Sequence, residues 1–535
     1  MKEKNDIEVD QVEYSGGKED WGTIIEEAKQ ATQEEHELTT IQALKLYPKA
    51  CFWSFIISMC VIMEGYDLQL IGALFAMPAF QKHYGEHYGE HGYQIPAKWQ
   101  TSLNMGNTVG SFIGILITGF VCDRIGYKKT LLGALVMMAA AIFATFFAPS
   151  IEVLLAGELL CGLPWGTFSI LAPAYASEVS PVVLRHYFTV YILLCWAIGQ
   201  LICAGVMTAF NHLDNHWAYR IPFGLQWIWP LPLFIIIIFA PESPWWLVRK
   251  GKYQQAENAL KKLTDKSRHS RNKLTVAMMI HTNQTELEEK EGTSYLDCFR
   301  GSNLRRTEIS CVAFAIQVIG GNGFCGNAVY FFEQAGLESS ASYKLNLGTA
   351  ALALVGGMLS WGVCTKFGRR SILFWGLVMQ CIIMLIIACV SLSPDSNTVA
   401  PWVQCAHVMV WMFVYYLTVA PITFAIIAET SATRLRAKTV GLARNAYLIA
   451  AIIQNIILPR MLNPSAWNWR GKTGFFFVGT TTVMIVWCYF RMPETKGRTY
   501  EELDILFAQG ISARKFAKTN VNAFATDEAI VTEEK

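Results

Sequence analysis

The sequence has few charged residues for its length. Of its 535 residues, 16% are charged and 53% are hydrophobic, whereas soluble domains carry about 25% charged residues. This deficit indicates a chain with much lipid-facing surface. The formal net charge is only +2, so the chain lacks the strongly basic character on which nucleic-acid binding depends. We therefore expect no nucleic-acid partner.

Motifs of enzymes and metal sites are also missing. The fourteen cysteines include no CxxC pair, and most lie inside apolar stretches, where cysteine packs as a small hydrophobic residue. Neither HExxH nor GxxxxGK[ST] occurs, and these motifs would supply a zinc site or a phosphate-binding loop. We therefore expect no enzyme, no metal and no cofactor.

Apolar stretches long enough to cross a bilayer recur along the chain. A span needs about 20 apolar residues, and in lipid only a helix satisfies its own backbone hydrogen bonds within one segment. The sequence therefore predicts an all-α integral membrane protein, surrounded by the lipid bilayer, with twelve transmembrane helices at 50–80, 99–122, 130–148, 151–176, 187–210, 221–240, 308–334, 345–364, 371–393, 402–428, 439–462 and 473–491.

Lys and Arg residues concentrate in alternate short loops. They follow the second, fourth, eighth and tenth spans, whereas loops 149–152 and 394–401 contain none. Because positively charged loops stay in the cytoplasm, both termini and loop 241–307 are predicted to be cytoplasmic. Residues 1–48 are polar and acidic, and we expect a disordered tail there.

Three short motifs occur twice in the same order, about 250 residues apart. The pairs are VCDRIG at 121–126 and VCTKFG at 363–368, Glu178-Val179-Ser180 and Glu429-Thr430-Ser431, and Pro241-Glu242-Ser243 and Pro493-Glu494-Thr495. This duplication predicts two six-helix pseudo-repeats with a midplane site between them, worked by rocking of the halves. The expected parts are a tail at 1–48, halves at 49–240 and 308–491, a linker with short surface helices at 241–307, and a cytoplasmic tail at 492–535.

These repeated motifs resemble those of the major facilitator superfamily, and specifically of its sugar porter family. The resemblance runs from about residue 45 to 518. A closer similarity, to fungal alpha-glucoside permeases (the maltose/proton symporters), is carried by Glu64-Gly65-Tyr66-Asp67, Cys161-Gly162-Leu163-Pro164-Trp165-Gly166, Cys195-Trp196-Ala197-Ile198-Gly199-Gln200, Pro222-Phe223-Gly224-Leu225-Gln226-Trp227-Ile228-Trp229-Pro230, Leu442-Ala443-Arg444-Asn445-Ala446-Tyr447 and Ala513-Arg514-Lys515-Phe516.

The resemblance implies the major facilitator fold and proton-coupled uptake of a maltose-like alpha-glucoside across the plasma membrane. The alternatives within transporters are a facilitator, or a proton symporter of a hexose, another disaccharide or a polyol. A transporter-like sugar sensor is a further alternative, but such sensors carry long signalling tails, and we expect only a short one at 492–535. No feature of the sequence predicts an oligomeric state.

Charged loop residues of this family are similar to a latch that holds one access state. By resemblance the latch comprises Asp123, Arg124, Glu178, Arg185, Arg369, Arg370, Glu429 and Arg436. We expect Glu178 with Arg185, and Glu429 with Arg436, to act as pairs. Ion pairs of this kind form and break as the halves rock.

Two acids lie inside the first span. Glu64 and Asp67 are three residues apart, so we expect them to share one helix face. A carboxylate at membrane depth usually marks a pathway or a proton relay, and two close carboxylates raise each other's proton affinity. The alternative is an ion pair that braces two helices. In sugar porters an acid at the Asp67 position couples the proton, which is the only coupling ion that we expect.

Two further charged residues depart from or extend this pattern. Glu158 in the fourth span stands where much of the family has an Arg that pairs with the first-span acid. It either adds a third acid or faces a cytoplasmic pocket. Arg444, near the start of the eleventh span, either answers one of the three acids or snorkels to the headgroups. Ser111 is another departure, because alpha-glucoside symporters tend to carry Glu there.

Sugar binding needs amides for the hydroxyls and aromatic faces for the ring. By register, the resemblance assigns the amides to Gln200, Gln317 and Asn322. Ile316 replaces the first member of the double Gln that the family usually carries. Plausible stacking surfaces are Trp196, Phe424 and Tyr447; for each of these aromatic residues the alternative is ordinary packing.

Overall fold

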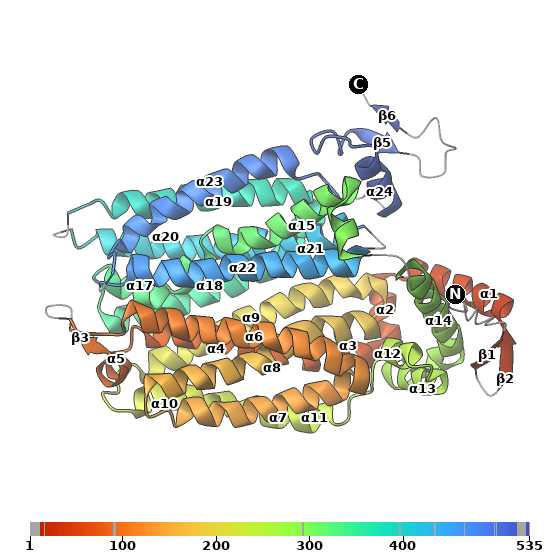
Figure 1. The fold of residues 1–535 in the computed structure, drawn as a ribbon, viewed down its shortest axis with the longest axis horizontal. Coiled ribbons are helices and arrows are strands. Elements are labelled where there is room, and N and C mark those ends of the chain that lie inside the picture. The colour runs from red at the N-terminus through yellow and green to blue at the C-terminus, as the bar shows by residue number, and fades with distance from the viewer. Residues whose placement is uncertain are drawn as a thin grey trace, which may run out of the picture.

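The computed structural model describes residues 11–14, 17–88, 92–290, 294–394, 397–432, 435–464, 466–496, 498, 500–521 and 531–533 (Figure 1). Within these ranges, twelve helical segments are long and apolar enough to cross a membrane. This confirms the predicted all-α class and the number of spans. The strands form three short antiparallel hairpins: β1 (Gln11–Tyr14) with β2 (Gly17–Asp20), β3 (Glu86–His87) with β4 (Tyr93–Gln94), and β5 (Thr519–Val521) with β6 (Val531–Glu533).

The first half contains six spans, two of which are interrupted. The spans are α3 (Pro48–Ser58) with α4 (Cys60–Leu74), α6 (Ala97–Ile125), α7 (Tyr127–Phe146), α8 (Ile151–Val179), α9 (Val182–Phe210), and α10 (Trp217–Leu225) with η2 (Gln226–Ile228) and α11 (Pro230–Ile237). A short helix, α5 (Pro78–Tyr84), follows the first span.

The second half also contains six spans, with breaks in its first and fourth members. The spans are α15 (Gly301–Ile319) with α16 (Asn322–Gly326) and α17 (Ala328–Gln334), α18 (Ser339–Lys366), α19 (Arg369–Val390), α20 (Ala400–Val414) with the π-helical η5 (Tyr415–Val419) and α21 (Ala420–Thr430), α22 (Arg436–Leu462), and η7 (Arg470–Lys472) with α23 (Thr473–Arg491). After it come α24 (Tyr500–Ala508) and β5.

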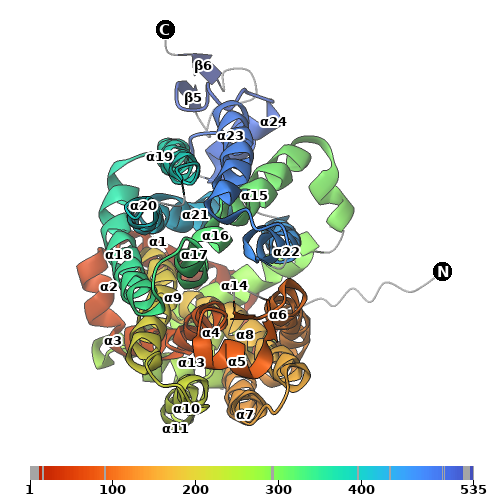
Figure 2. The same ribbon diagram turned by 90° about the vertical axis from the view of Figure 1, so that its left-hand side faces the viewer.

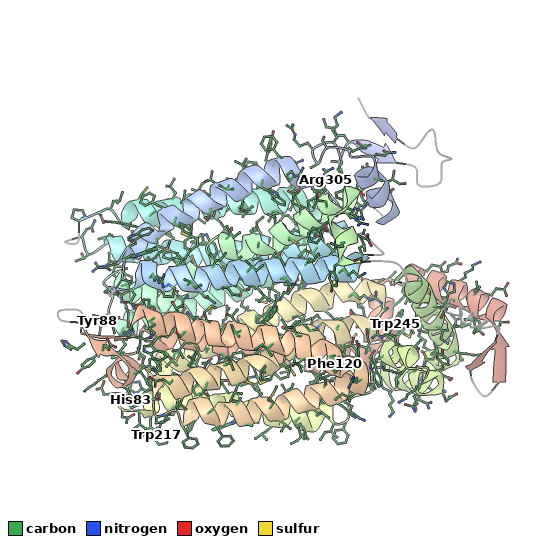
Figure 3. The ribbon with its side chains drawn as sticks, viewed as in Figure 1. His83, Tyr88, Phe120, Trp217, Trp245 and Arg305 are labelled. Carbon is green, nitrogen blue, oxygen red and sulfur yellow. The ribbon has the colours of Figure 1, made fainter. Side chains whose placement is uncertain are left out.

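The two halves lie side by side with their spans roughly along the long axis of the molecule (Figures 1 and 2). One end carries α12–α14, α1 and α24, and we call it the linker end. The opposite end carries α5, β3 and the start of α10, and we call it the loop end. Figure 3 marks the loop end with His83 and Trp217, and the linker end with Trp245 and Arg305.

The linker between the halves is helical. It comprises α12 (Pro244–Arg249), α13 (Tyr253–Leu263), η3 (Lys266–Arg271), α14 (Asn272–Lys290) and η4 (Tyr295–Phe299). The two surface helices expected at 252–264 and 272–290 correspond to α13 and α14.

The expectation of a disordered tail over residues 1–48 is wrong for residues 21–46. They form α1 (Trp21–Glu37) and α2 (Thr40–Leu46), while residues 1–10, 15 and 16 lie outside the described residues. Helix α1 packs against α14 and buries Ile24, Ala28 and Ala31, which recur at helical spacing. Polar composition hid this narrow apolar stripe, which needs α14 as its partner.

Small residues set the distance between neighbouring spans. Glycines at positions 106, 110 and 114 of α6 face α8, and a Cβ added at Gly162 of α8 would lie 2.6 Å from the carbonyl oxygen of Asn107. Such close backbone contact is typical of helices that pack in lipid, where dispersion replaces the hydrophobic effect. The acid-bearing helix α8 is thereby held tightly inside the first half.

Candidate functional site

Two acids meet at the centre of the first half. Asp67 in α4 is 1% exposed, and its Oδ1 accepts a hydrogen bond of 2.6 Å from Nε2 of Gln226 in η2. Glu158 in α8 is 0% exposed and interacts directly with the Asp67 carboxyl group. The structure therefore places Glu158 against Asp67 as a further acid, and not in a pocket at the linker end.

The pair leaves several buried oxygen atoms without donors. Among the described residues, Oδ2 of Asp67 and both carboxyl oxygens of Glu158 have no hydrogen-bond partner. An ionised carboxylate only accepts hydrogen bonds, whereas a protonated carboxyl group also donates one. Two ionised carboxylates in contact repel each other, but one proton between them turns a repulsive contact into a hydrogen bond. The geometry thus suits a carboxyl pair that holds one proton.

Glu64 occupies a different environment from Asp67. It is only partly buried, and the charges and polar groups that act on it belong to Arg444 of α22 and Trp196 of α9. The two first-span acids therefore have different partners, since Asp67 interacts with Gln226 and Glu158. Three residues turn a helix by about 300°, not a full circle, so the two side chains are directed to different helices.

Arg444 of the second half provides the positive charge that acts on Glu64 of the first half. Its guanidinium group lies 5.0 Å from the ring centre of Tyr447 and 5.9 Å from that of Phe314. Aromatic faces stabilise a cation that is withdrawn from water. Arg444 is therefore held at the interface between the halves rather than directed to the headgroups.

Both predicted sugar-binding glutamines are held by tyrosines that the sequence reasoning missed. Oε1 of Gln317 accepts a hydrogen bond of 3.2 Å from the hydroxyl group of Tyr415, and Oε1 of Gln200 accepts one of 3.1 Å from that of Tyr416. The second bond joins the two halves. Both tyrosines lie in η5, and single π-helical turns often occur at functional sites. An adjacent pair of tyrosines inside an apolar span was the available signal, because each buried hydroxyl group needs a partner.

Asn322 lies at a break in the seventh span. The break is made by Gly321, whose φ of 102° is in the left-handed region, where glycine alone is unstrained. Thr480 of α23 donates to the carbonyl oxygen of Ile319 at 2.9 Å. The side-chain amide nitrogen of Gln454 in α22 donates to the carbonyl oxygen of Val318 at 3.1 Å, and its amide oxygen accepts from the backbone N–H of Gly323 at 2.8 Å. Neighbouring spans thus satisfy the backbone groups that the break releases.

The predicted stacking residues divide into two groups. Phe424 and Tyr447 both pack against Phe314, with ring centres 5.2 and 5.8 Å apart and nearly perpendicular planes. Phe314 was not among the expected residues. Trp196 lies on the other side of the interface, beside Glu64. All three predicted aromatic residues are partly buried, so each retains an exposed surface.

The latch residues are paired differently from the expectation. Glu178 accepts hydrogen bonds from Arg249 at 2.6 Å and from the Tyr127 hydroxyl group at 2.9 Å, and it also bonds Ser243. Glu178 thus forms an ion pair with Arg249, which the resemblance did not include in the latch. Folding brings α12 under the end of α8. Arg185 lines a small pocket together with Glu178.

The second half repeats this arrangement. Glu429 pairs with Arg369 at 2.9 Å and accepts a hydrogen bond of 2.5 Å from Thr495. The expected partner was Arg436, whose side chain lies outside the described residues. The first pair joins α8 to the linker helix α12, and the second joins α19 to α21 within the second half. Neither pair bridges the two halves.

The glutamates of the repeated Pro-Glu motifs, Glu242 and Glu494, cap the N-terminus of the third span in each half. Glu242 accepts from the backbone N–H groups of Tyr127 at 2.9 Å and Lys128 at 3.3 Å, where α7 begins. Glu494 likewise accepts from that of Arg369 at 2.7 Å, where α19 begins. A carboxylate at a helix N-terminus satisfies free N–H groups and the helix dipole. Burial raises the pKa of Glu242 above its usual value, and these N–H groups oppose the shift.

The remaining predicted latch residues make local contacts. Asp123 and Arg124 are exposed; the Arg124 guanidinium group lies 4.0 Å from the ring centre of Phe120, and the backbone carbonyl of Asp123 accepts from Trp246 of α12 at 3.2 Å. Arg370 donates to the carbonyl oxygen of Tyr489 at 2.7 Å. None of these contacts joins the two halves.

Comparison with known proteins bears out the resemblance. Residues 53–507 match the family model described as "Sugar (and other) transporter". The maltose permease MAL31 of Saccharomyces cerevisiae is 38% identical over 550 residues, covering 99% of this chain and 89% of the relative. The general alpha-glucoside permease of the same species is 38% identical over 506 residues, covering 93% and 82%.

Solved structures share the fold. The xylose transporter XylE from E. coli, in a partially occluded inward-open conformation, matches with a TM-score of 0.68 at 17% identity, covering 84% of this chain and 100% of that one. The same transporter bound to a bromodeoxyglucose also gives a TM-score of 0.68. The chain is therefore a multi-pass membrane protein with the major facilitator fold and belongs to the sugar (and other) transporter family.

Proposed function

We propose that the protein is a proton symporter that takes up a maltose-like alpha-glucoside across the plasma membrane. The observation that carries the proposal is the buried contact between Asp67 and Glu158, next to an amide site that spans the halves. Relatives named maltose and alpha-glucoside permeases support the substrate class. The positions of Lys and Arg residues support a cytoplasmic linker end and cytoplasmic termini.

Proton binding is assigned to the acid pair. Because Asp67 and Glu158 are buried and in contact, they carry one proton more readily than none, and a proton taken from outside removes a repulsion inside the first half. Gln226 donates to Asp67 at 2.6 Å and stabilises whichever oxygen atom remains ionised. Release of the proton to the cytoplasm restores the starting state.

Sugar binding is assigned to the interface. Gln200 and Gln317 are bonded to Tyr416 and Tyr415, so a sugar hydroxyl group exchanges partners with groups that are already oriented. Asn322 lies where the seventh span breaks, and such a break is a place where helices rearrange around a ligand. Tyr447 and Phe424 supply apolar faces for the sugar ring.

The link between proton and sugar is assigned to Glu64 and Arg444. Their charges interact across the two halves, directly beside Tyr447 and Trp196. Rocking of the halves changes this separation, and a buried charge is costly without its partner. Sugar bound between the halves and a proton held inside the first half therefore favour the same closed arrangement.

The membrane potential is large enough to drive accumulation of the sugar inside the cell. One charge that moves down 100 mV releases about 2.3 kcal/mol, which supports about a fortyfold concentration ratio because 1.4 kcal/mol corresponds to tenfold. A proton gradient adds to this ratio.

The change in external pH on addition of a sugar shows both whether that sugar is a substrate and whether its uptake is coupled to protons. Candidate sugars are added to weakly buffered cells that express the protein, and we expect alkalinisation with maltose or a related alpha-glucoside. Cells that carry an empty vector are the control. Uptake that leaves the pH unchanged and survives an uncoupler would indicate a facilitator and contradict the symport proposal. Alkalinisation with hexoses alone would contradict the substrate class.

A further inference from the structure

A pair of buried amides joins the halves outside the site described above. Nε2 of Gln69 in α4 donates to Oδ1 of Asn346 in α18 at 3.2 Å. The side chains are 9% and 2% exposed, respectively. Nearby, the hydroxyl group of Tyr343 donates to the carbonyl oxygen of Ala73 at 2.7 Å, which also links the two halves. Polar groups thus line this part of the interface.

The rise along helix α9 gives the distance between this pair and Gln200, one of the two glutamines of the site described above. Gln200 of α9 is bonded to Tyr416, and five residues farther along, Gly205 faces the side chain of Leu347, the neighbour of Asn346. At a rise of about 1.5 Å per residue, the amide pair lies roughly 7 Å beyond Gln200 towards the loop end. That distance is comparable with the length of one hexose ring.

The pair has unused hydrogen-bonding capacity. Among the described residues, Nδ2 of Asn346 is buried without any acceptor, and an unsatisfied buried donor is unfavourable. Because the bond crosses the interface, it must break when the halves separate at the loop end. Gln69 and Asn346 then each present a donor and an acceptor, which is the pattern that binds neighbouring sugar hydroxyl groups.

We propose that Gln69 and Asn346 form an outer subsite that binds the second ring of a disaccharide while the loop end is open. The inference rests on the proposed function, and it names the residues that distinguish a disaccharide from a single ring. The first ring occupies Gln200 and Gln317. The second ring bonds the outer amides, which bond each other again once the sugar has moved on and the loop end is closed.

Uptake of two sugars from outside tests the subsite. Gln69→Leu and Asn346→Leu are compared with the unchanged protein for initial uptake of maltose and of methyl alpha-glucoside, which has only one ring. We expect the KM for maltose to rise about tenfold, equivalent to 1.4 kcal/mol and consistent with the loss of one or two hydrogen bonds, while the KM for methyl alpha-glucoside changes less than about twofold. Surface expression is measured for every variant.

A matched variant separates binding from closure of the loop end. Asn455 donates to Oγ1 of Thr108 at 3.1 Å, and this bond also joins the halves. Asn455→Leu weakens the closed interface without touching the outer amides, so it should leave the ratio of the two KM values unchanged. If Asn346→Leu shifts both sugars equally, as a purely structural bond would, the subsite is refuted. Should the leucine variants fail to reach the surface, Gln69→Met removes the amide with little change in volume and gives the same test.

The unchanged protein keeps the two proposals distinguishable. Maltose uptake by the unchanged protein, with the same KM ratio in all variants, would overturn the outer subsite and leave the proposed function standing. Absence of disaccharide uptake by the unchanged protein would overturn both.

Discussion

The two halves share polar contacts at the linker end, which we call their rims, and differ in their interiors. At the linker end, Glu178 accepts hydrogen bonds from Tyr127 and Ser243, and Glu429 accepts them from Arg369 and Thr495 at the equivalent positions. Inside the membrane, the first half contains the contact between Asp67 and Glu158, whereas the facing part of the second half contains amides, tyrosines and Arg444. The repeated parts hold each half rigid, and the differing parts provide chemistry that a symmetric pair would lack.

The proposed proton-binding and sugar-binding residues are not completely separated between the two halves. Gln200 of the first half is bonded to Tyr416 of the second, and the charge of Arg444 in the second half acts on Glu64 in the first. The proposed sugar site therefore straddles the interface, while the buried acid pair belongs to one half alone. The following predictions test whether proton and sugar functions separate along this line.

The largest expected effect is that of Asp67→Asn. The variant cannot carry an exchangeable proton on this residue, so concentrative uptake should be lost while exchange of labelled for unlabelled sugar continues. Accumulation and counterflow of labelled maltose measure the two activities. Asp214→Asn, which changes an exposed carboxylate, is the control. Full accumulation in Asp67→Asn would remove Asp67 from the coupling mechanism.

Glu158→Gln should have the next largest effect. The new amide donates to Asp67 permanently and stabilises its ionised form, so half-maximal uptake should require a more acidic outside solution. We expect accumulation at neutral external pH to fall at least about tenfold, which corresponds to 1.4 kcal/mol. Uptake measured across external pH provides the test. An unchanged pH profile would show that Glu158 has only a packing role.

The rims should respond alike. Glu178→Gln and Glu429→Gln each weaken charge-assisted hydrogen bonds to an arginine, and bonds of this kind contribute about 1.5–3 kcal/mol. We expect both variants to lower the unfolding temperature of the purified protein by similar amounts, with the maltose KM nearly unchanged. Thermal unfolding followed by tryptophan fluorescence measures the effect. A large fall in only one variant would break the equivalence of the two rims.

The smallest effect is expected at the tyrosines. Tyr415→Phe and Tyr416→Phe each remove one hydrogen bond to a glutamine, worth about 1 kcal/mol, so the maltose KM should change about fivefold. The number of protons taken up per sugar should stay the same, because the acid pair is untouched. Simultaneous measurement of pH and labelled sugar checks both quantities. A change in stoichiometry would contradict the separation of proton and sugar sites.

Sequence reasoning found the polar residues inside the spans but assigned some of them to the wrong neighbours. Glu64 and Asp67 were expected to act together because they are three residues apart. In the structure each has its own partner, since a small rotation about the axis of α4 directs them to different helices. The resemblance paired Glu178 with Arg185, whereas the ion pair in the structure is with Arg249 of α12, because the sequence does not specify which helix ends meet.

Composition likewise determined the class but not every element. Twelve apolar stretches fixed the number of spans because lipid admits only hydrogen-bonded helices. The polar region 21–46 gave no such signal, because α1 is stabilised by the surface of α14 and not by its own hydrophobicity. Tyr415 and Tyr416 were overlooked for a related reason: aromatic residues are common in spans, and only a partner distinguishes them.

The sequence by itself determined that this protein is a duplicated twelve-helix membrane protein with acids and amides at membrane depth. These features follow from local physical chemistry, namely the length of apolar runs, the cost of buried charge and the repetition of short motifs. The tertiary structure alone decided that Asp67 meets Glu158, that Arg444 answers Glu64 and that Gln69 bonds Asn346. Such contacts join residues that are far apart in sequence, and only the packing of the helices brings them together.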